Sequence, residues 1–502
     1  MGIQRRRQNE SQRTACIWLA VALALAFLLM RLPLLTRLPV FVDEGAHIFW
    51  AQENLAGGWV DGKWLSIVIM AGFVGGLPLP PLLAARLCAV ILSLGSLLLI
   101  ISIGARLGTR RDGLLAGLIY VLLPYTFFYD RLALTDHSMI LFGLLGVLLT
   151  LDILHAYRSG GAILLTLALI AAMLAKLTGA LYVAVPILGV GILIPVRRWR
   201  AVIPRILPAL ISAAVVYLAL RAREFAATQF AEKLAEPAPL ANLEQMAEWA
   251  WMLLTPPFAI VAVLAAGRAA LSRQRADIFL LALLALFILP YVVGAGVLYP
   301  RYLLPALGPL IVLCGRFLNA TGERITHTLT SRPVRTAVLA GGLALLAAWP
   351  LTLNALIAVD PASAPLPERV RWQYITGWPS GTGLDEAARF IQEQAASEPG
   401  GVTVLHISSL SSSFLGLRLV LPPSGNVRLE ALDPSWPELA AIVQERAAQG
   451  RTFLVLSPVA EGAYTIWPGR SLVDLLAQGT LIWEYPKDHG SSLQIWEFRP
   501  GS

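Results

Sequence analysis

Long apolar runs dominate the first 357 residues and limit what this chain can fold into. A helix that crosses a membrane needs about 20 mostly apolar residues, and eleven such runs follow one another. Because a single soluble core stops growing near about 300 residues, this much apolar sequence must face lipid. We therefore predict an α-helical polytopic membrane protein with spans near 14–33, 82–105, 113–129, 137–156, 161–175, 178–196, 202–220, 249–266, 277–298, 302–318 and 336–357.

The arginines predict how these spans are oriented. Arginine-rich loops alternate with arginine-poor ones, and the positive-inside rule assigns the arginine-rich loops to the cytoplasm. They lie near residues 5–13, 106–111, 158, 197–200, 268–275 and 324–335. We therefore expect a cytoplasmic N-terminus, an uncleaved first helix and an extracytoplasmic C-terminal region in the cell membrane. The formal net charge of +8 follows from this loop pattern, which indicates membrane lipids and no nucleic acid as partner.

The composition changes to that of an aqueous domain after residue 357. We predict a transmembrane domain at 1–357 and an extracytoplasmic α/β domain at 358–502. In the second domain, 381–396 predicts an amphipathic helix with Thr382 as its N-cap and Asp385 at the capping-box position. The remaining predicted elements are a helix over 434–449, buried strands over 402–408 and 451–457, and a hairpin over 481–486 and 492–498. The short apolar stretch 64–77 predicts an interfacial or re-entrant element on the outer side.

An acidic pair, Asp43 and Glu44, follows the first span on the predicted outer side. A carboxylate held near the membrane surface can act as a general base, because partial burial and a like charge raise its pKa. The alternative is structural, with Asp43 capping a short helix and Glu44 interacting with the helix dipole. His47 lies one turn beyond Asp43.

Further ionisable groups fall on the same predicted side. Asp130, Arg131, Asp136 and His137 lie within YDRLALTDHS, and the structural alternative for Arg131 is an ion pair with either aspartate. Lys176 stands between two apolar runs, where its ammonium must reach the interface or bind an anion. Arg301 and Tyr302 belong to YPRYLLPALGPL. Two acids and three cations on one membrane surface indicate a lipid-linked phosphate as ligand, since cations stabilise phosphoryl oxygens.

These motifs, in this order and on this side of the membrane, resemble the GT-C superfamily of membrane glycosyltransferases. VDE (42–44) resembles the acidic motif of the first outer loop, and the similarity is greatest to the protein O-mannosyltransferases and the bacterial aminoarabinose transferase. YDRLALTDHSMILFG, AKLTG and YPRYLLPALGPL resemble the later conserved segments. The oligosaccharyltransferase signature WWD is absent.

The resemblance implies a GT-C-like fold and an inverting transfer of a sugar from a polyprenyl-phosphate carrier to a protein, lipid or glycan acceptor. It implies that Asp43 is the base and Glu44 its acidic neighbour. Arg131 and Asp136 would line the second loop, with Arg131 also holding the carrier phosphate, and Lys176, Arg301 and Tyr302 would contact that phosphate. No cofactor is required by the sequence. A divalent metal held by His47 and His137 with the neighbouring aspartates is an unsupported alternative.

Other functions fit the sequence less well. A transporter or flippase of lipid-linked saccharides would have internal repeats and charges at mid-membrane, and the sequence has neither. A polymerase or ligase of such saccharides would have a large outer loop between late helices, whereas the longest one before residue 358 is only 221–248. A sensor would not need eleven spans.

Overall fold

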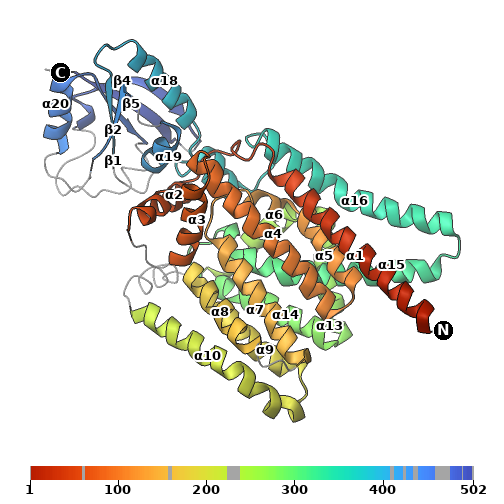
Figure 1. Cartoon of the computed structure of the whole chain (residues 1–502). Coiled ribbons are helices and arrows are strands. Elements are labelled where there is room, and N and C mark those ends of the chain that lie inside the picture. Colours follow the sequence, from red (N-terminus) through yellow and green to blue (C-terminus); the bar gives the residue numbers. More distant parts are fainter. Residues whose placement is uncertain are drawn as a thin grey trace. The chain divides into compact units, whose positions relative to one another are not determined.

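The structure, a computed structural model, divides the chain into two compact units. It describes residues 2–58, 63–156, 161–222, 238–407, 412–421, 425–432, 439–457, 475–488 and 490–499. The helical unit comprises Met1–Leu35, Glu53–Gly76 and Ala85–Val359, and the α/β unit comprises Thr36–Gln52, Leu77–Ala84 and Asp360–Ser502. The segment with the acidic pair therefore belongs to the same unit as the C-terminal domain. Figure 1 shows the helices and strands coloured along the sequence.

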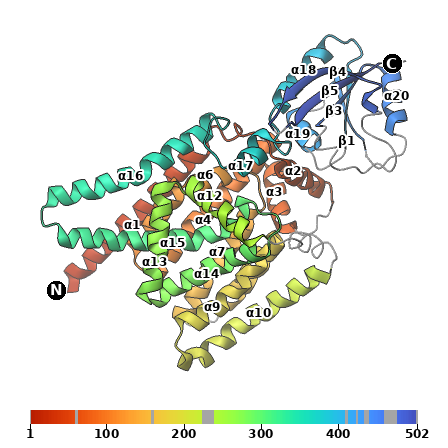
Figure 2. The same ribbon diagram turned by 180° about the vertical axis from the view of Figure 1, so that it is seen from behind.

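The helical unit is built from apolar helices, two of which, α2 and α4, begin in the α/β unit. Figure 2 shows α12, α13 and α14 side by side within it. The helices are α1 (Gly2–Arg31), α2 (Val42–Leu55), α3 (Trp64–Gly76), α4 (Pro81–Leu107), α5 (Arg110–Leu122), α6 (Pro124–Tyr129), α7 (Asp136–Ala156), α8 (Gly161–Ala175), η1 (Leu177–Val183), α9 (Ala184–Leu193), η2 (Val196–Arg198), α10 (Trp199–Ala222), α12 (Pro239–Leu253), α13 (Pro256–Ser272), α14 (Arg275–Gly294), η3 (Pro300–Leu303), α15 (Leu304–Thr328) and α16 (Arg332–Val359).

Seven helices in the described part of the chain are long and apolar enough to cross a membrane, and four more apolar helices are shorter. The chain is thus a multi-pass membrane protein. Two of the predicted spans are each divided between separate α-helices. The run 113–129 is divided into α5 and α6, because Pro124 starts a new helix after extended Leu123. The run 249–266 is divided between α12 and α13 at Thr255, since two prolines begin α13.

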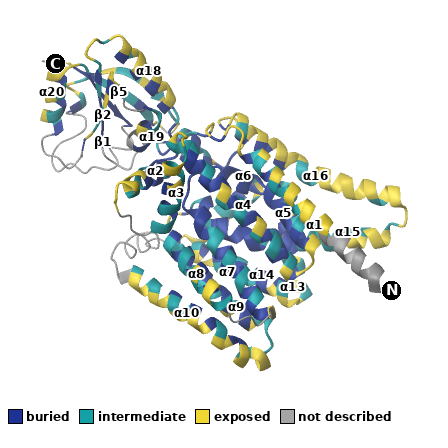
Figure 3. Ribbon diagram, viewed as in Figure 1, coloured by how far each residue is buried: buried dark blue, intermediate teal, exposed yellow. Residues whose placement is uncertain are grey.

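Burial distinguishes the inner helices from the outer ones (Figure 3). In α15, 67% of the most apolar window is buried, whereas in α10 and α16 only 22% is buried. The exposed side chains of α16 include Leu345 at 73% and Trp349 at 53%. Exposed apolar surface of this extent is typical of contact with lipid.

The α/β unit contains a five-stranded sheet of order β2-β1-β3-β5-β4. β1, β2 and β3 are parallel, and β5 and β4 continue the sheet antiparallel. One face packs on α18 and α19 and the other on α20, each through buried aliphatic side chains. The elements are α17 (Glu368–Arg371), η4 (Trp372–Thr376), α18 (Leu384–Ala396), β1 (Val402–Ile407), α19 (Ser412–Val420), β2 (Val427–Leu432), α20 (Leu439–Gln449), β3 (Thr452–Leu456), β4 (Thr480–Pro486) and β5 (Ser492–Phe498).

Most predicted elements of this unit are present, but the predicted cap is wrong. α18 is preceded by Gly383 at φ 91°, with no side-chain cap. The Thr382 hydroxyl instead hydrogen-bonds to the Ile375 carbonyl, so it is not available to the helix. The structure adds α19 and β2, which the sequence patterns did not reveal. Residues 434–438 of the predicted 434–449 helix lie outside the described residues.

Candidate functional site

Four of the predicted site residues lie together in the helical unit: Asp136, Lys176, Arg301 and Tyr302, here called the Lys176 cluster. The Lys176 ammonium donates to Asp136 Oδ1 at 2.7 Å and lies 5.7 Å from the centroid of the Tyr302 ring. The Arg301 guanidinium lies 5.6 Å from the same ring. The cluster therefore combines two cations and one carboxylate around an aromatic ring.

Lys176 owes its position to the AKLTG sequence. α8 ends at Ala175, Lys176 is extended (φ −163°, ψ 134°), and η1 begins at once. The Gly179 N–H donates back to the Lys176 carbonyl at 2.8 Å. A Cβ atom on Gly179 would lie only 2.2 Å from the Ala172 carbonyl oxygen. Only glycine therefore allows η1 to fold tightly against the end of α8.

Arg301 lies in η3, directly before α15, and tyrosines surround it. Its guanidinium lies 5.5 Å from the Tyr299 ring, and Tyr302 stacks on Tyr291 at 5.7 Å. The Tyr125 hydroxyl donates to the Pro300 carbonyl at 2.6 Å. Arg301 is 9% exposed, and the Lys176 side chain is 18% exposed. Both cations are thus mostly buried, which strengthens their attraction for an anion.

Ser66 supports this cluster and was missed by the sequence interpretation. Its hydroxyl donates to the Ala175 carbonyl at 2.7 Å and lies 2.5 Å from the Ser138 hydroxyl. It thereby joins α3 to the end of α8, next to Lys176, and to the start of α7, next to Asp136. The signal in the sequence is a single hydroxyl within the apolar run WLSIVIMAGF.

Arg131 contacts a different set of groups. It is fully buried, and its Nη2 donates to the carbonyls of Pro33 (3.2 Å) and Leu34 (2.5 Å), in the turn after α1. Burial, together with the charges of Arg86 and Arg31, lowers the pKa of Arg131 to about 10. Of the three cations predicted to meet, the structure brings two together, and Arg131 holds the turn that follows the first helix.

Neither aspartate of the second loop pairs with Arg131. Asp136 pairs with Lys176, and Asp130 accepts from Arg31 Nε at 2.8 Å. Arg31 and Asp130 are 0% and 5% exposed, and Arg31 also donates to the Tyr120 and Val121 carbonyls. This buried pair fixes the end of α1 against the start of the second loop.

In the α/β unit, the acidic pair lies in the first turn of α2. The Glu44 carboxylate is fully buried and accepts from the Phe41 N–H at 3.0 Å. This is the reach-back hydrogen bond of a capping box, so Glu44 stabilises the start of the helix. Asp43 is half-buried. The two acids therefore differ in role, and Asp43 is the candidate for acid–base chemistry.

Backbone hydrogen bonds join the first turn of α2 to the rest of the α/β unit. The Val42 N–H donates to the Pro379 carbonyl at 2.9 Å, and the Gly381 N–H donates to the Val40 carbonyl at 2.7 Å. A Cβ atom on Gly45 would lie 2.7 Å from the Leu415 Cβ of α19. Glycine thus allows α2 to approach α19 closely.

Neither histidine near the acidic motifs lies in a metal-like cluster. His137 Nδ1 is 3.1 Å from the Ser93 hydroxyl and Nε2 is 3.0 Å from the Leu132 carbonyl, so both ring nitrogens have partners. His47 is 2% exposed and lies beside Trp50. Among the residues that the structure describes, no three His, Cys, Asp or Glu side chains come together as a metal site would require.

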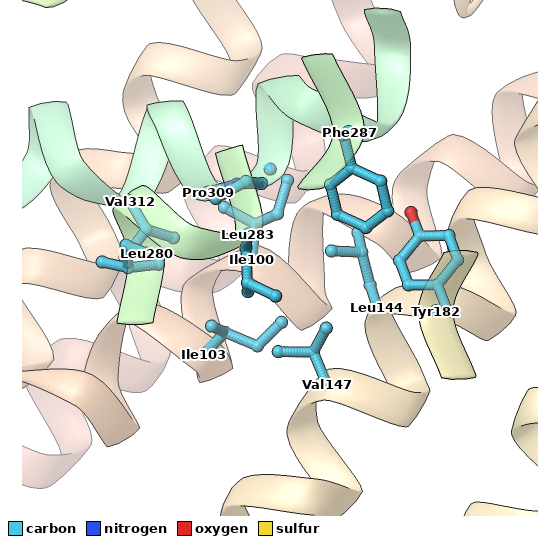
Figure 4. A pocket seen from close by; sticks show the side chains of 11 residues that line it. Ile100, Ile103, Leu144, Val147, Tyr182, Leu280, Leu283, Phe287, Pro309 and Val312 are labelled. Carbon is cyan, nitrogen blue, oxygen red and sulfur yellow. The ribbon is translucent and has the colours of Figure 1, made fainter. Parts of the chain in front are cut away.

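A small cavity lies among α4, α7, η1, α14 and α15 (Figure 4). Its volume of about 10 Å³ is no more than one water molecule needs. The Tyr182 ring packs on Phe287 at its edge, with centroids 4.8 Å apart, and the other lining residues are apolar. It is a packing gap rather than a substrate site.

Comparison with solved structures identifies the fold. The chain is similar to the aminoarabinose transferase ArnT from Cupriavidus metallidurans, in a crystal structure bound to undecaprenyl phosphate, with a TM-score of 0.59 and 13% identity over 96% of this chain and 98% of that one. The apo form of ArnT gives the same TM-score at 15% identity. The chain has the GT-C fold.

A second GT-C neighbour is the oligosaccharyltransferase from Archaeoglobus fulgidus, with a TM-score of 0.52 and 10% identity over 94% of this chain and 73% of that one. No protein-family model matches the sequence, and no curated protein matches it. At such low identity the likeness establishes the fold alone, and the chemistry must be argued from the residues above.

Proposed function

We propose that the protein is an inverting glycosyltransferase that takes a sugar from a polyprenyl-phosphate carrier at the outer face of the cell membrane. The observation that carries the proposal is the Lys176 cluster, which gathers two mostly buried cations at the ends of apolar helices. A phosphate joined to an isoprenoid chain requires cations for its oxygens and an apolar path for its chain. The GT-C fold agrees with it, since ArnT of the same fold is bound to undecaprenyl phosphate in its crystal structure.

In this mechanism Lys176 and Arg301 bind the phosphoryl oxygens of the carrier. The Lys176 ammonium has three N–H donors, and one of them is used by Asp136. The others can donate to phosphate, while Asp136 and the Tyr302 ring orient the side chain. As the bond from the sugar C1 to the phosphate oxygen breaks, negative charge grows on the phosphate, and the two cations stabilise it.

The Asp43 carboxylate accepts the proton of the acceptor. The acceptor oxygen or nitrogen attacks C1 from the side opposite the phosphate, forms the new glycosidic bond and inverts the anomeric centre. Glu44 caps α2 and so positions Asp43. Arg131 holds the turn after α1 through the Pro33 and Leu34 carbonyls. In this proposal the N-terminus is cytoplasmic and the α/β unit extracytoplasmic.

The test uses the full chain in nanodiscs, labelled polyprenyl-phosphate sugars and a cell-envelope acceptor fraction. Asp43→Asn should bind the donor as the wild type does and form no product. Lys176→Met should weaken donor binding. Normal product formation by Asp43→Asn would contradict the proposal. So would movement of the lipid-linked sugar across the bilayer without a glycoside product, which would indicate a transporter.

A further inference from the structure

The segment from Trp372 to Gly383, WQYITGWPSGTG, has no role in the proposed mechanism. It starts with a π-helix, η4, a geometry that is rare and often found at functional sites. The Gly377 N–H closes it by donating to the Trp372 carbonyl at 2.7 Å. A Cβ atom on Gly377 would lie 2.4 Å from that oxygen and 2.7 Å from the Trp372 ring nitrogen. Glycine is therefore needed for this tight turn.

The turn brings two tryptophans together. The rings of Trp372 and Trp378 meet edge to face, with centroids 6.2 Å apart and planes at 86°. The Arg369 guanidinium lies 5.5 Å from the centroid of the Trp372 ring. All three side chains are half-buried, so part of each remains accessible. We call them the tryptophan platform.

Polar side chains hold the platform rigidly. The buried Ser380 hydroxyl lies within hydrogen-bond distance of the Tyr374 and Ile375 carbonyls, at 3.0 and 3.1 Å. The Lys487 ammonium donates to the Ser380 carbonyl at 2.6 Å. Several hydrogen bonds thus fix a short loop in which Trp372, Thr376, Trp378 and Thr382 stay half-buried and the other residues are buried. Rigid aromatic side chains are efficient binding groups, because they lose little conformational entropy when a ligand binds.

The platform lies beside Asp43 within the α/β unit. Pro379, the residue after Trp378, accepts a hydrogen bond from the Val42 N–H at 2.9 Å, and Asp43 follows Val42. Phe41 and Ser380 form an antiparallel β-bridge. The Phe41 ring also packs on the Tyr374 ring, with centroids 4.5 Å apart. Two adjoining backbone segments therefore carry the proposed base and the platform.

This arrangement fits a sugar ring. The C–H groups on one face of a pyranose form an apolar surface that packs on an indole, and its hydroxyls need polar partners at the edge. The Arg369 guanidinium, which lies over the Trp372 ring, carries N–H donors close to that ring. Gln373, between the platform residues in sequence, is 4% exposed, and no hydrogen-bond partner of its Oε1 is found in the described residues. This buried oxygen is thus an acceptor without a partner among the described residues, one position after Trp372.

We propose that the tryptophan platform is the acceptor subsite, on which a saccharide acceptor stacks so that its hydroxyl or amine reaches Asp43. This inference rests on the proposed function, and it names the acceptor class, a glycan or glycolipid sugar. The competing role for these tryptophans is anchoring in the membrane interface, where Trp is enriched. Two experiments distinguish these roles: the first measures whether the rings bind saccharide, and the second measures whether they lie in lipid.

The first experiment presents the full chain in nanodiscs to an array of neutral and acidic oligosaccharides. Trp372→Ala and Trp378→Ala should weaken binding of the retained saccharide about 30-fold or more, as for other tryptophan hot spots. The matched control is Trp483→Ala, since Trp483 is half-buried in the same unit but stacks on Phe390. Equal binding by all variants, or no saccharide retained by the wild type, would overturn the inference.

The second experiment measures tryptophan fluorescence in nanodiscs made of lipids with brominated acyl chains, which quench rings lying in lipid. The fluorescence of Trp372 and Trp378 is obtained by subtracting the signal of the Trp372→Phe/Trp378→Phe variant from that of the wild type. The brominated lipids should not quench this difference. Strong quenching would overturn the inference in favour of a membrane anchor. Binding of labelled polyprenyl phosphate is measured in parallel and should be unchanged in the Trp→Ala variants. Failure of the wild type to bind polyprenyl phosphate would contradict the proposed function. Loss of saccharide binding alone in the Trp→Ala variants would support the acceptor subsite.

Discussion

In the proposed mechanism Lys176 has two roles: it binds the carrier phosphate and it compensates the buried charge of Asp136. Variants of this ion pair allow the two roles to be measured separately. The Asp136 side chain is 5% exposed, and the Lys176 ammonium is 2.7 Å from it. Removal of one partner from a buried pair leaves an uncompensated charge and costs about 3–5 kcal/mol. Because the charge of Arg301 also acts on Asp136, we expect Lys176→Met to lower the free energy of unfolding by about 3 kcal/mol, the lower end of this range.

The double variant Lys176→Met/Asp136→Asn should regain most of that stability, because residue 136 then carries no buried negative charge that needs the ammonium. Donor binding should not recover, because the cation that holds the phosphate is still missing. A hydrogen bond to a charged group contributes about 1.5–3 kcal/mol, which corresponds to about 10- to 150-fold in the dissociation constant for polyprenyl phosphate. Denaturant unfolding and binding of labelled polyprenyl phosphate, both in detergent micelles, measure the two quantities.

Recovery of both stability and binding in the double variant would refute this reasoning, because Lys176 would then serve only to compensate Asp136. The control is Arg106→Met. Arg106 also pairs with an aspartate, Asp152, but the two side chains are 51% and 36% exposed. An exposed pair of this kind contributes about 0–1 kcal/mol, so neither stability nor donor binding should change appreciably.

Three further predictions follow from the structure. Glu44→Gln should keep the hydrogen bond to Phe41 and most of the transfer activity, whereas Glu44→Ala should cost about 1 kcal/mol of stability; equal activity loss in both would instead indicate that the charge of Glu44 is needed. Burial lowers the pKa of His406 from 6.5 to about 4, so the unfolded chain binds a proton more readily than the folded one. The free energy of unfolding of the α/β unit should therefore fall by about 3 kcal/mol as the pH drops from about 6.5 to 4. Hydrogen exchange of β1 in the full chain should show this fall in the wild type but not in His406→Leu. Arg31→Met should leave Asp130 buried without its ion-pair partner and cost about 3–5 kcal/mol in denaturant unfolding, and an unchanged unfolding midpoint would contradict the role of this pair.

The membrane fold and the Lys176 cluster were accessible from the sequence because they depend on strong local signals. Apolar runs of membrane length predict helices, and each isolated charge between them must have a partner or a function. Lys176 and Arg301 stand out for this reason. Lys176 and Arg301 both lie close to Asp136. The sequence predicts all three residues on the same side of the membrane, where the ends of helices can converge.

The rest depends on contacts between residues far apart in the chain. Arg31 appears in the sequence as an ordinary helix-end arginine, and only the fold shows that it pairs with Asp130. Nothing local indicates that Thr36–Gln52 packs with the C-terminal domain, because the hydrogen bonds that join them link residues more than 300 positions apart. Thr382 was misjudged as a cap because its hydroxyl is engaged by the Ile375 carbonyl, a contact that no cap pattern includes.

The most direct test of the central claim is a cryo-EM structure of the full chain in nanodiscs with a polyprenyl-phosphate sugar, using Asp43→Asn to prevent turnover. We expect phosphate density within hydrogen-bond distance of Lys176 Nζ and the Arg301 guanidinium. We also expect residue 43 to face the sugar C1 from the side opposite the phosphate. Density for the phosphate away from both cations, or residue 43 remote from the sugar, would contradict the proposed transferase mechanism.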